Sequence, residues 1–144
     1  MGTTIVRVGT IYLPVKEVNL SAEWYVEKLG AELSYQDEDK AIVNFANQSF
    51  FLVKAAENQT ANFLDSHGKE RFSVTFEVNG LEALISLHQE LIEKGVKVGS
   101  IEDRGHPGNN FVFYDCSGNL FDVWSELSPT FKAGDKDMGT GSLS

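Results

Sequence analysis

The sequence predicts an α+β fold built from two βαβββ modules. The predicted elements run strand, helix and three strands up to residue 55, and the same order returns between residues 72 and 127. A shift of 63 positions aligns Thr10–Leu13 with Ser73–Phe76, and a shift of 70 aligns Phe50–Val53 with Leu120–Val123. Apolar and polar positions agree in phase in both alignments. Such an internal repeat indicates two copies of one supersecondary unit.

Length and composition bound the class of protein. With 144 residues, 42% of them hydrophobic, the chain has the size and apolar content of one ordinary domain with a core. It contains no apolar run long enough to span a bilayer and no signal-peptide pattern at its start. The single cysteine, Cys116, excludes an internal disulfide framework and a multi-cysteine metal site. We therefore expect a reduced, cytoplasmic protein.

The charge balance argues against polyanionic partners. The chain carries 21 acidic and 12 basic residues, a net charge of −9. A protein that binds nucleic acid needs a basic surface to meet the phosphates, and one that binds an anionic membrane needs it for the same reason. We therefore expect neither partner. The acid excess would suit a cationic ligand, although such an excess also serves solubility alone.

Module one is expected to span residues 5–55. It begins with an extended, β-branched run at 5–15, followed by a helix from Asn19, the expected N-cap, to Gly30, a natural C-terminal stop. Short strands are predicted at 31–35, 41–45 and 49–55, with polar turns between them. Residues 56–71 are polar and lack periodicity, so they form either a linker or a mobile loop over a site.

Module two is expected to span residues 72–127. The pattern predicts a strand at 72–78, an amphipathic helix at 80–94 that ends at Gly95, and strands at 97–102, 111–115 and 120–125. A tight turn is predicted at 115–119. The segment 128–144 is rich in glycine, serine and charged residues, so we expect a disordered tail after a domain of residues 1–127.

Strand alternation assigns the side chains to two faces. One row in each strand is apolar and should pack under the helices: Ile11, Leu13, Val15, Phe51, Val53, Val74, Phe76 and Val78. The opposite rows should form an open face: Thr10, Tyr12, Phe50, Leu52, Lys54, Ser73, Thr75, Glu77, Leu120, Asp122 and Trp124. Aromatic rings and hydroxyl groups together suit a small organic molecule.

The side chains on this open face can be interpreted in more than one way. Aromatic rings would hold a ligand, and the polar side chains would orient it. The carboxylates of Glu77 and Asp122 could meet a cationic group, as could the aromatic faces, or could serve as a pair in acid/base chemistry. In the alternative interpretation, Lys54 neutralises a carboxylate and the aromatic rings only fill the concave side of the sheet.

Three stretches resemble a known superfamily. They are V-K-E-V-N-L-S-A-E-W-Y at 15–25 with L-G at 29–30, F-E-V-N-G-L at 76–81, and D-C-S-G-N-L-F-D at 115–122. In this order they resemble the vicinal-oxygen-chelate proteins, which include glyoxalase I, bleomycin-resistance proteins, fosfomycin-resistance enzymes and ring-cleaving dioxygenases. The resemblance covers about Val8 to Glu126 and implies a glyoxalase-like curved mixed sheet around a cleft. It also implies a homodimer, since such modules often pair across chains.

The same resemblance identifies where a metal would be held. Metal-dependent members carry one ligand on the first strand and one on the last strand of each module, usually His, Glu or Gln. The corresponding positions here are Thr10, Leu52, Ser73 and Asp122. Only Asp122 is a credible ligand. A slip of one residue moves every side chain to the other face, and a slip of two adds no histidine. We therefore expect neither a metal nor another cofactor.

Four residues outside the strands are further candidates. Arg104 and His106 lie in the loop 104–110, which either contacts a ligand or is a solvent-exposed turn. His88 falls on the apolar side of the predicted helix 80–94, where a core or interface role is expected. Cys116 has no paired base in the sequence, so a nucleophilic role is not expected.

Three functions therefore compete. The first is metal-free binding of a small organic molecule, which could be cationic, in the manner of the bleomycin-resistance proteins. The second is a lyase, isomerase or dioxygenase of the same superfamily with an altered ligand set, which predicts bound metal, or a metal-free carboxylate mechanism, which predicts turnover that depends on Glu77 or Asp122. The third is a non-catalytic scaffold or interaction protein that keeps the fold and has lost the site.

Overall fold

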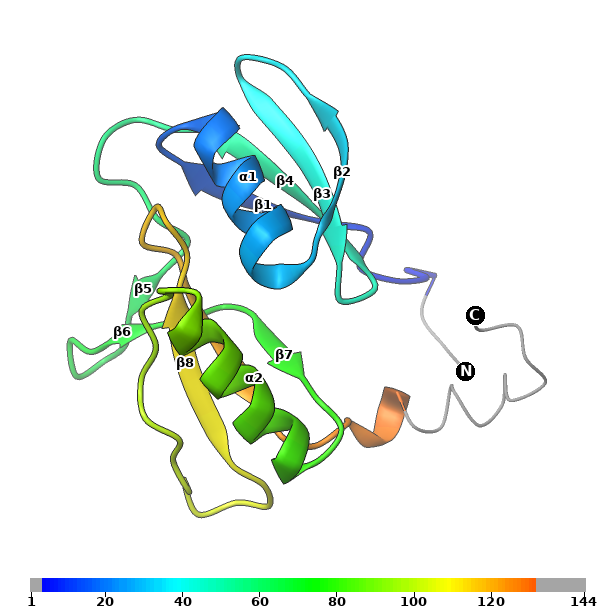
Figure 1. Ribbon diagram of the computed structural model, residues 1–144, viewed down its shortest axis with the longest axis vertical. Coiled ribbons are helices and arrows are strands. Elements are labelled where there is room, and N and C mark those ends of the chain that lie inside the picture. The colour runs from blue at the N-terminus through cyan, green and yellow to red at the C-terminus, as the bar shows by residue number, and fades with distance from the viewer. Residues whose placement is uncertain (1–3, 132–144) are drawn as a thin grey trace. The chain divides into compact units, whose positions relative to one another are not determined.

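The first module forms a four-stranded mixed sheet with one helix on one face (Figure 1). The computed structural model describes residues 4–131. The strands β1 (Thr10–Val15), β2 (Glu32–Gln36), β3 (Lys40–Phe45) and β4 (Gln48–Lys54) lie in the order β1-β4-β3-β2. The pair β1–β4 is parallel, and the pairs β3–β4 and β2–β3 are antiparallel. The helix α1 (Val18–Leu29) makes the connection from β1 to β2 and packs on the sheet.

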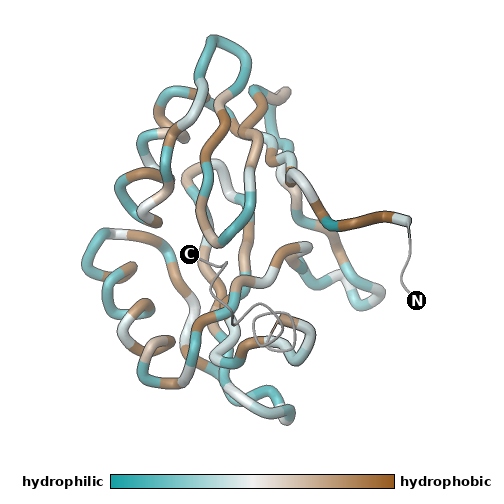
Figure 2. Tube along the Cα trace, turned by 90° about the vertical axis from the view of Figure 1, so that its right-hand side faces the viewer, coloured by the Kyte–Doolittle hydropathy of each residue, from teal (hydrophilic) through white to brown (hydrophobic). Residues whose placement is uncertain are grey.

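The core of this module lies between α1 and the sheet. The helix buries Val18, Ala22 and Tyr25, and the sheet buries Leu13, Val43, Phe50 and Leu52. The rings of Phe45 and Phe50 stack with centroids 4.5 Å apart. In Figure 2 the polar turn between β2 and β3 is teal, whereas the strands contain brown segments.

The ends of α1 test the predicted helix signals. Gly30 follows the helix in a left-handed conformation with φ 72°, so the predicted stop is confirmed. The prediction that Asn19 is the N-cap is wrong, since the helix begins at Val18 with Glu17 as its N-cap. Val18 is only 4% exposed, and its burial against the sheet draws the first turn forward. The Asn19 side chain instead accepts a hydrogen bond from Gln36.

The second module repeats the same arrangement in a smaller sheet. The strands β7 (Thr75–Glu77), β8 (Asn110–Tyr114) and β9 (Leu120–Trp124) lie in the order β7-β9-β8, with β7 and β9 parallel as β1 and β4 are. The helix α2 (Leu81–Glu93) begins 63 positions after α1. The α+β fold with two βαβββ modules is therefore confirmed.

One predicted strand of the second module is reduced to two bridges. Within 97–102, only Val98 and Glu102 pair, with Phe113 and Asn110 respectively. Gly99 and Ser100 interrupt this segment, and both residue types favour regular strands weakly.

The core of the second module is aromatic. Leu84 and Leu91 of α2 are fully buried, and the sheet buries Phe111, Phe113, Phe121 and Val123. The ring of Phe76 lies 5.3 Å from that of Phe121. His88 is half-buried on α2, where its ring meets Phe111 edge-on at 4.8 Å and its Nε2 lies 2.8 Å from the Gly99 carbonyl oxygen. This is the packing role expected for His88.

The segment between the modules is more ordered than its polar composition suggests. Within 56–71, the strands β5 (Phe63–Leu64) and β6 (Glu70–Arg71) form a small antiparallel hairpin. The Asp65 carboxylate accepts hydrogen bonds from the backbone N–H groups of His67 and Lys69 and thereby fixes the turn. A hairpin this short has too few positions to give a sequence periodicity.

The turn between β8 and β9 belongs to the first of two compact units. Residues 4–73 and 114–120 make up the first unit, and residues 74–113 and 121–131 make up the second. The buried Asp115 carboxylate accepts hydrogen bonds from the backbone N–H groups of Ser117 and Asn119, from the Asn119 side chain and from the Tyr25 hydroxyl. The predicted tight turn is confirmed, and its aspartate is its organising residue.

No helix within residues 4–131 is long and apolar enough to cross a membrane. Of the predicted disordered tail, residues 128–131 are described, and Ser128 donates hydrogen bonds from its backbone and hydroxyl to Glu77. The rest of that tail, 132–144, lies outside the described residues.

Candidate functional site

The polar face of the second sheet gathers most of the predicted site residues of module two. The register pairs Thr75 with Asp122 and Glu77 with Trp124, so these four side chains share one face. The alternate residues, including Phe76 and Phe121, point to the core under α2. The faces predicted for these strands from alternation are therefore correct.

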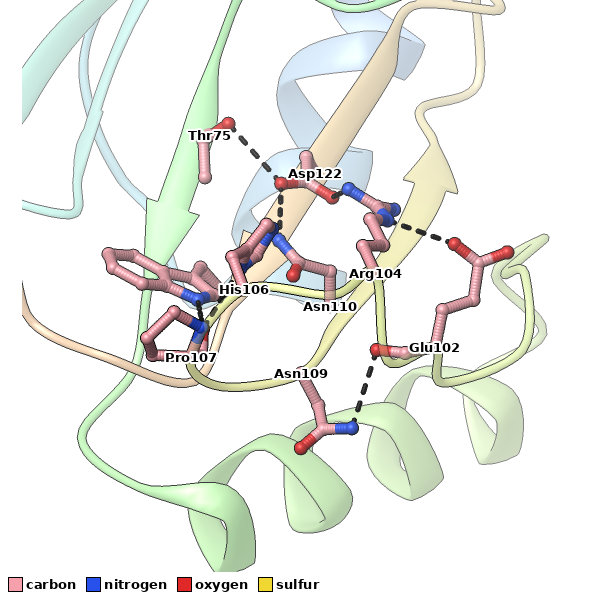
Figure 3. A network of polar contacts seen from close by, with 9 residues as sticks. Thr75, Glu102, Arg104, His106, Pro107, Asn109, Asn110 and Asp122 are labelled. Carbon is pink, nitrogen blue, oxygen red and sulfur yellow. Dashed lines mark hydrogen bonds and ion pairs between the residues drawn. The ribbon is translucent and has the colours of Figure 1, made fainter.

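Asp122 is the centre of a hydrogen-bonded network on this face (Figure 3). Its Oδ2 atom accepts a hydrogen bond from Asn110 Nδ2 at 2.9 Å and one from Thr75 Oγ1 at 3.3 Å. Its Oδ1 atom lies 3.1 Å from Arg104 Nη1. The Asp122 residue is only 2% exposed, so these partners replace the water that an exposed carboxylate would bind.

Arg104 lies between two carboxylates. Its Nε donates a hydrogen bond to Glu102 Oε1 at 2.9 Å, while its guanidinium faces Asp122 on the other side. The Arg104 side chain is 28% exposed, and that of Asp122 is 3% exposed. Among the described residues, Arg104 therefore supplies the ion pair of the Asp122 carboxylate.

The loop that carries Arg104 contacts Trp124 at the end of β9 and the next residue, Ser125. The Trp124 indole Nε1 donates a hydrogen bond to the Pro107 carbonyl oxygen at 2.9 Å, and the backbone N–H of Asn109 donates one to Ser125 Oγ at 2.8 Å. The His106 ring meets the Trp124 ring edge-on at 6.1 Å. Loop residues 103–109 therefore cover part of the polar face and bring Arg104 and His106 to Asp122 and Trp124.

The two carboxylates proposed as a pair have separate partners. Glu77 accepts the hydrogen bonds from Ser128, whereas Asp122 is held by Arg104 and Asn110. Within residues 4–131, no hydrogen bond joins the two carboxylates.

Asn110 is the member of this network that the sequence analysis missed. It is 3% exposed and begins β8. The buried phenylalanines at 111 and 113 give the signal that could have found it, because alternation places position 110 on the opposite face from theirs. The predicted strand began one residue later, at 111.

In the first module, two predicted ligand-facing residues lie on the wrong face. Phe50 is 1% exposed and Leu52 is fully buried, because both pack in the core with Leu13, the register partner of Leu52. The exposed face instead carries Tyr12 and Phe51, whose ring centroids are 4.9 Å apart. The phase of β4 was misassigned because both of its rows are apolar. Of the other predicted residues, Thr10 is half-buried, and Lys54 and Ser73 are exposed.

This correction also changes the repeat. Tyr12 pairs with Phe51 in the first sheet as Thr75 pairs with Asp122 in the second. The residue equivalent to Asp122 is therefore Phe51, which is a shift of 71 and not 70.

The residues at the metal-ligand positions that the resemblance implies do not fit a divalent metal. Thr10, Ser73 and the corrected position Phe51 offer no imidazole and no carboxylate, and the remaining carboxylate of Asp122 is already paired with Arg104. Within residues 4–131, no cluster of three or more His, Cys, Asp or Glu side chains could hold a metal ion.

Cys116 and a surface groove, both in the first unit, take no part in the network around Asp122. Cys116 is exposed as a residue, but its thiol donates to Ser21 Oγ at 3.6 Å, and burial of the sulfur raises the pKa of the thiol. A shallow groove of about 400 Å³ beside the turn between β3 and β4 is lined in part by Arg7 and Asn47 and includes no predicted site residue.

Comparison with known proteins identifies relatives of this arrangement. A model of the Glyoxalase/Bleomycin resistance protein/Dioxygenase superfamily matches residues 5–123. No curated protein sequence matches the chain significantly.

Solved structures share the fold at low sequence identity. The fosfomycin resistance protein FosX from Listeria monocytogenes, complexed with Mn(II) and sulfate, has a TM-score of 0.68 and 17% identity over 86% of this chain and 93% of its own. Lactoylglutathione lyase from Agrobacterium tumefaciens has a TM-score of 0.67 and 12% identity over 85% and 96%. TnmS3, an antibiotic binding protein from Streptomyces sp. CB03234, has a TM-score of 0.62 and 19% identity over 88% and 100%.

Proposed function

Because the chain belongs to the glyoxalase/bleomycin resistance/dioxygenase superfamily, we propose that it binds a small organic molecule without a catalytic metal. The proposed site is the polar face of the second sheet, around Thr75, Asp122 and Trp124. The state of Asp122 is the observation that carries the proposal, since this carboxylate is ion-paired with Arg104 and belongs to no metal-ligating cluster within residues 4–131.

The similar structures do not share one function, so the fold alone does not indicate the function of this chain. Their names describe a lyase, a resistance protein complexed with Mn(II) and an antibiotic binding protein, all on one fold. The fold therefore hosts both metal-dependent and binding functions, and the side chains of each member must decide between them. In this chain, they favour binding.

The proposed recognition combines one flat aromatic surface with hydrogen-bonding groups. Trp124 is half-buried, so its indole can cover a planar ligand at little cost in side-chain entropy. Thr75 is exposed beside Asp122 and would orient a polar group of the ligand.

We also propose that the protein is a cytoplasmic homodimer, as its superfamily and its single cysteine suggest. Size-exclusion chromatography with light scattering tests the dimer. A mass twice that of one chain is expected, and the mass of one chain would contradict it.

A thermal-shift screen tests the proposed function. Chelator-treated protein is heated with Mn(II), Ni(II), Zn(II) or Fe(II), and separately with a library of planar organic molecules. A true ligand at about 100 times its Kd stabilises the folded state by about 2.7 kcal/mol. We expect such stabilisation from organic compounds, reduced in Trp124→Phe and unchanged in Glu93→Ala, a surface control on α2.

Stabilisation by a divalent metal would overturn the proposal if Asp122→Ala abolished it and Glu93→Ala did not. That outcome would favour the metal-dependent members of the superfamily.

A further inference from the structure

The Arg104–Asp122 contact resembles a bound ligand more than a structural ion pair. The guanidinium comes from an exposed loop and reaches a carboxylate that the sheet has buried. Glu102 holds the Nε side of the same group. A cation from the loop thus occupies the polar face at its buried carboxylate, Asp122.

The buried acceptors beneath Arg104 are incompletely satisfied. Asn110 donates to Asp122 through Nδ2, but its Oδ1 atom is buried and has no hydrogen-bond partner among residues 4–131. Asp122 Oδ1 meets Arg104 only as an ion pair, without a well-directed hydrogen bond. A buried acceptor without a partner is unfavourable, because it has lost its hydrogen bond to water and gained none in the protein. Arg104 therefore neutralises the charge of Asp122 but leaves Asp122 Oδ1 and Asn110 Oδ1 without a hydrogen bond.

The surroundings favour a flat cation over a compact one. Trp124 lies two residues beyond Asp122 on the same face of β9, and its half-buried ring can receive a planar cation. An amidinium or guanidinium group presents two parallel N–H donors along one edge, which is the geometry that matches two neighbouring acceptors. An ammonium group carries the same charge but lacks that flat edge.

We propose that the Arg104 guanidinium occupies the place of a ligand group beside Asp122. An incoming molecule would bind there through its own amidinium or guanidinium group. The incoming group displaces the Arg104 side chain, pairs with Asp122 and donates to Asn110 Oδ1, while its flat face lies against Trp124. No covalent step is involved. The inference rests on the function proposed above for the same face and specifies the chemical class of its ligand.

Benzamidine is the probe, because it is a planar amidinium on an aromatic ring. Its affinity is measured by calorimetric titration at low ionic strength for the wild type and for Arg104→Gln, which removes the competing charge but keeps a hydrogen-bond donor. Lys94→Gln is the matched control, since it removes the same charge from the exposed Lys94–Glu90 pair.

We expect Arg104→Gln to bind benzamidine about tenfold or more tightly than the wild type, which corresponds to about 1.4 kcal/mol. Lys94→Gln should match the wild type, and the double variant Arg104→Gln with Asp122→Asn should lose the gain. Benzamide, the neutral isostere, should not bind, and benzylamine should bind more weakly than benzamidine. Equal affinity in Arg104→Gln and the wild type, or equal binding of benzamide, would overturn the inference.

A second measurement needs no variant. In the wild type, the Arg104 Nε–H resonance should shift saturably with benzamidine and not with benzamide, because the guanidinium leaves Asp122. A resonance unmoved at saturating benzamidine would contradict displacement. If organic compounds stabilise the wild type while benzamidine fails both tests, only this inference fails, and the proposed function stands.

Discussion

Replacing Tyr25 by phenylalanine removes one hydroxyl group from the core of the first unit. That hydroxyl donates to Asp115 Oδ2 at 2.5 Å, and Tyr25 is fully buried while Asp115 is 5% exposed. The ring stays in place, so the substitution opens no large cavity. The carboxylate keeps its bonds from Ser117 and Asn119 but loses one donor that water cannot easily replace.

The structure sets the expected size of this effect. A hydrogen bond to a charged group contributes about 1.5–3 kcal/mol to folding, so Tyr25→Phe should lower the free energy of unfolding by about 2 kcal/mol. Tyr35→Phe is the matched control, because the Tyr35 hydroxyl donates to Asp37 Oδ2 at 2.7 Å but Tyr35 is 47% exposed. Its loss should stay within about 0.5 kcal/mol.

Urea denaturation followed by circular dichroism measures both free energies. Burial, followed by the Asp115 charge and hydrogen bond, raises the pKa of Tyr25 well above its usual value near 10. A raised folded-state pKa gives stability that is complete below the unfolded pKa and is lost as pH rises through the folded one. The gap between wild type and Tyr25→Phe should therefore shrink above about pH 10. Equal losses in Tyr25→Phe and Tyr35→Phe at neutral pH would refute the reasoning.

Three further predictions concern single positions. Ala46 has φ 52° in the turn between β3 and β4, so Ala46→Gly should raise the free energy of unfolding by about 0.5–1 kcal/mol in urea denaturation, and a loss would contradict the strain. Cys116 should react with iodoacetamide several-fold more slowly than free glutathione, because burial raises its thiol pKa, and a faster reaction would indicate an activated thiol. Asp122→Asn should cost about 1–3 kcal/mol in thermal denaturation, since it removes the buried charge that is paired with Arg104, and an unchanged midpoint would mean that the buried pair adds no net stability.

Periodicity was sufficient for the order of elements and for most faces. Gly30 ended α1 where predicted, and the alternation in β7 and β9 placed Thr75, Asp122 and Trp124 together. These elements have one apolar row and one polar row, so their orientation can be determined from a single sequence.

The sequence-based predictions fail where both rows of a strand are apolar, or where no sequence pattern indicates the contact. Both rows of β4 are apolar, so only pairing with β1 shows that Phe50 faces the core and Phe51 does not. Arg104 and Asn110 approach Asp122 through the fold of a loop, and no spacing in the sequence indicates that contact. The Arg104–Asp122 ion pair, on which the proposed function rests, could therefore be identified only from the structure.

A crystal structure of the protein purified without chelators and with added metal tests the central claim most directly. The account predicts an organic ligand against Trp124 and no metal ion coordinated by Asp122, which should contact Arg104 or the ligand. A divalent ion bound to the Asp122 carboxylate, with Arg104 displaced from it, would contradict the account.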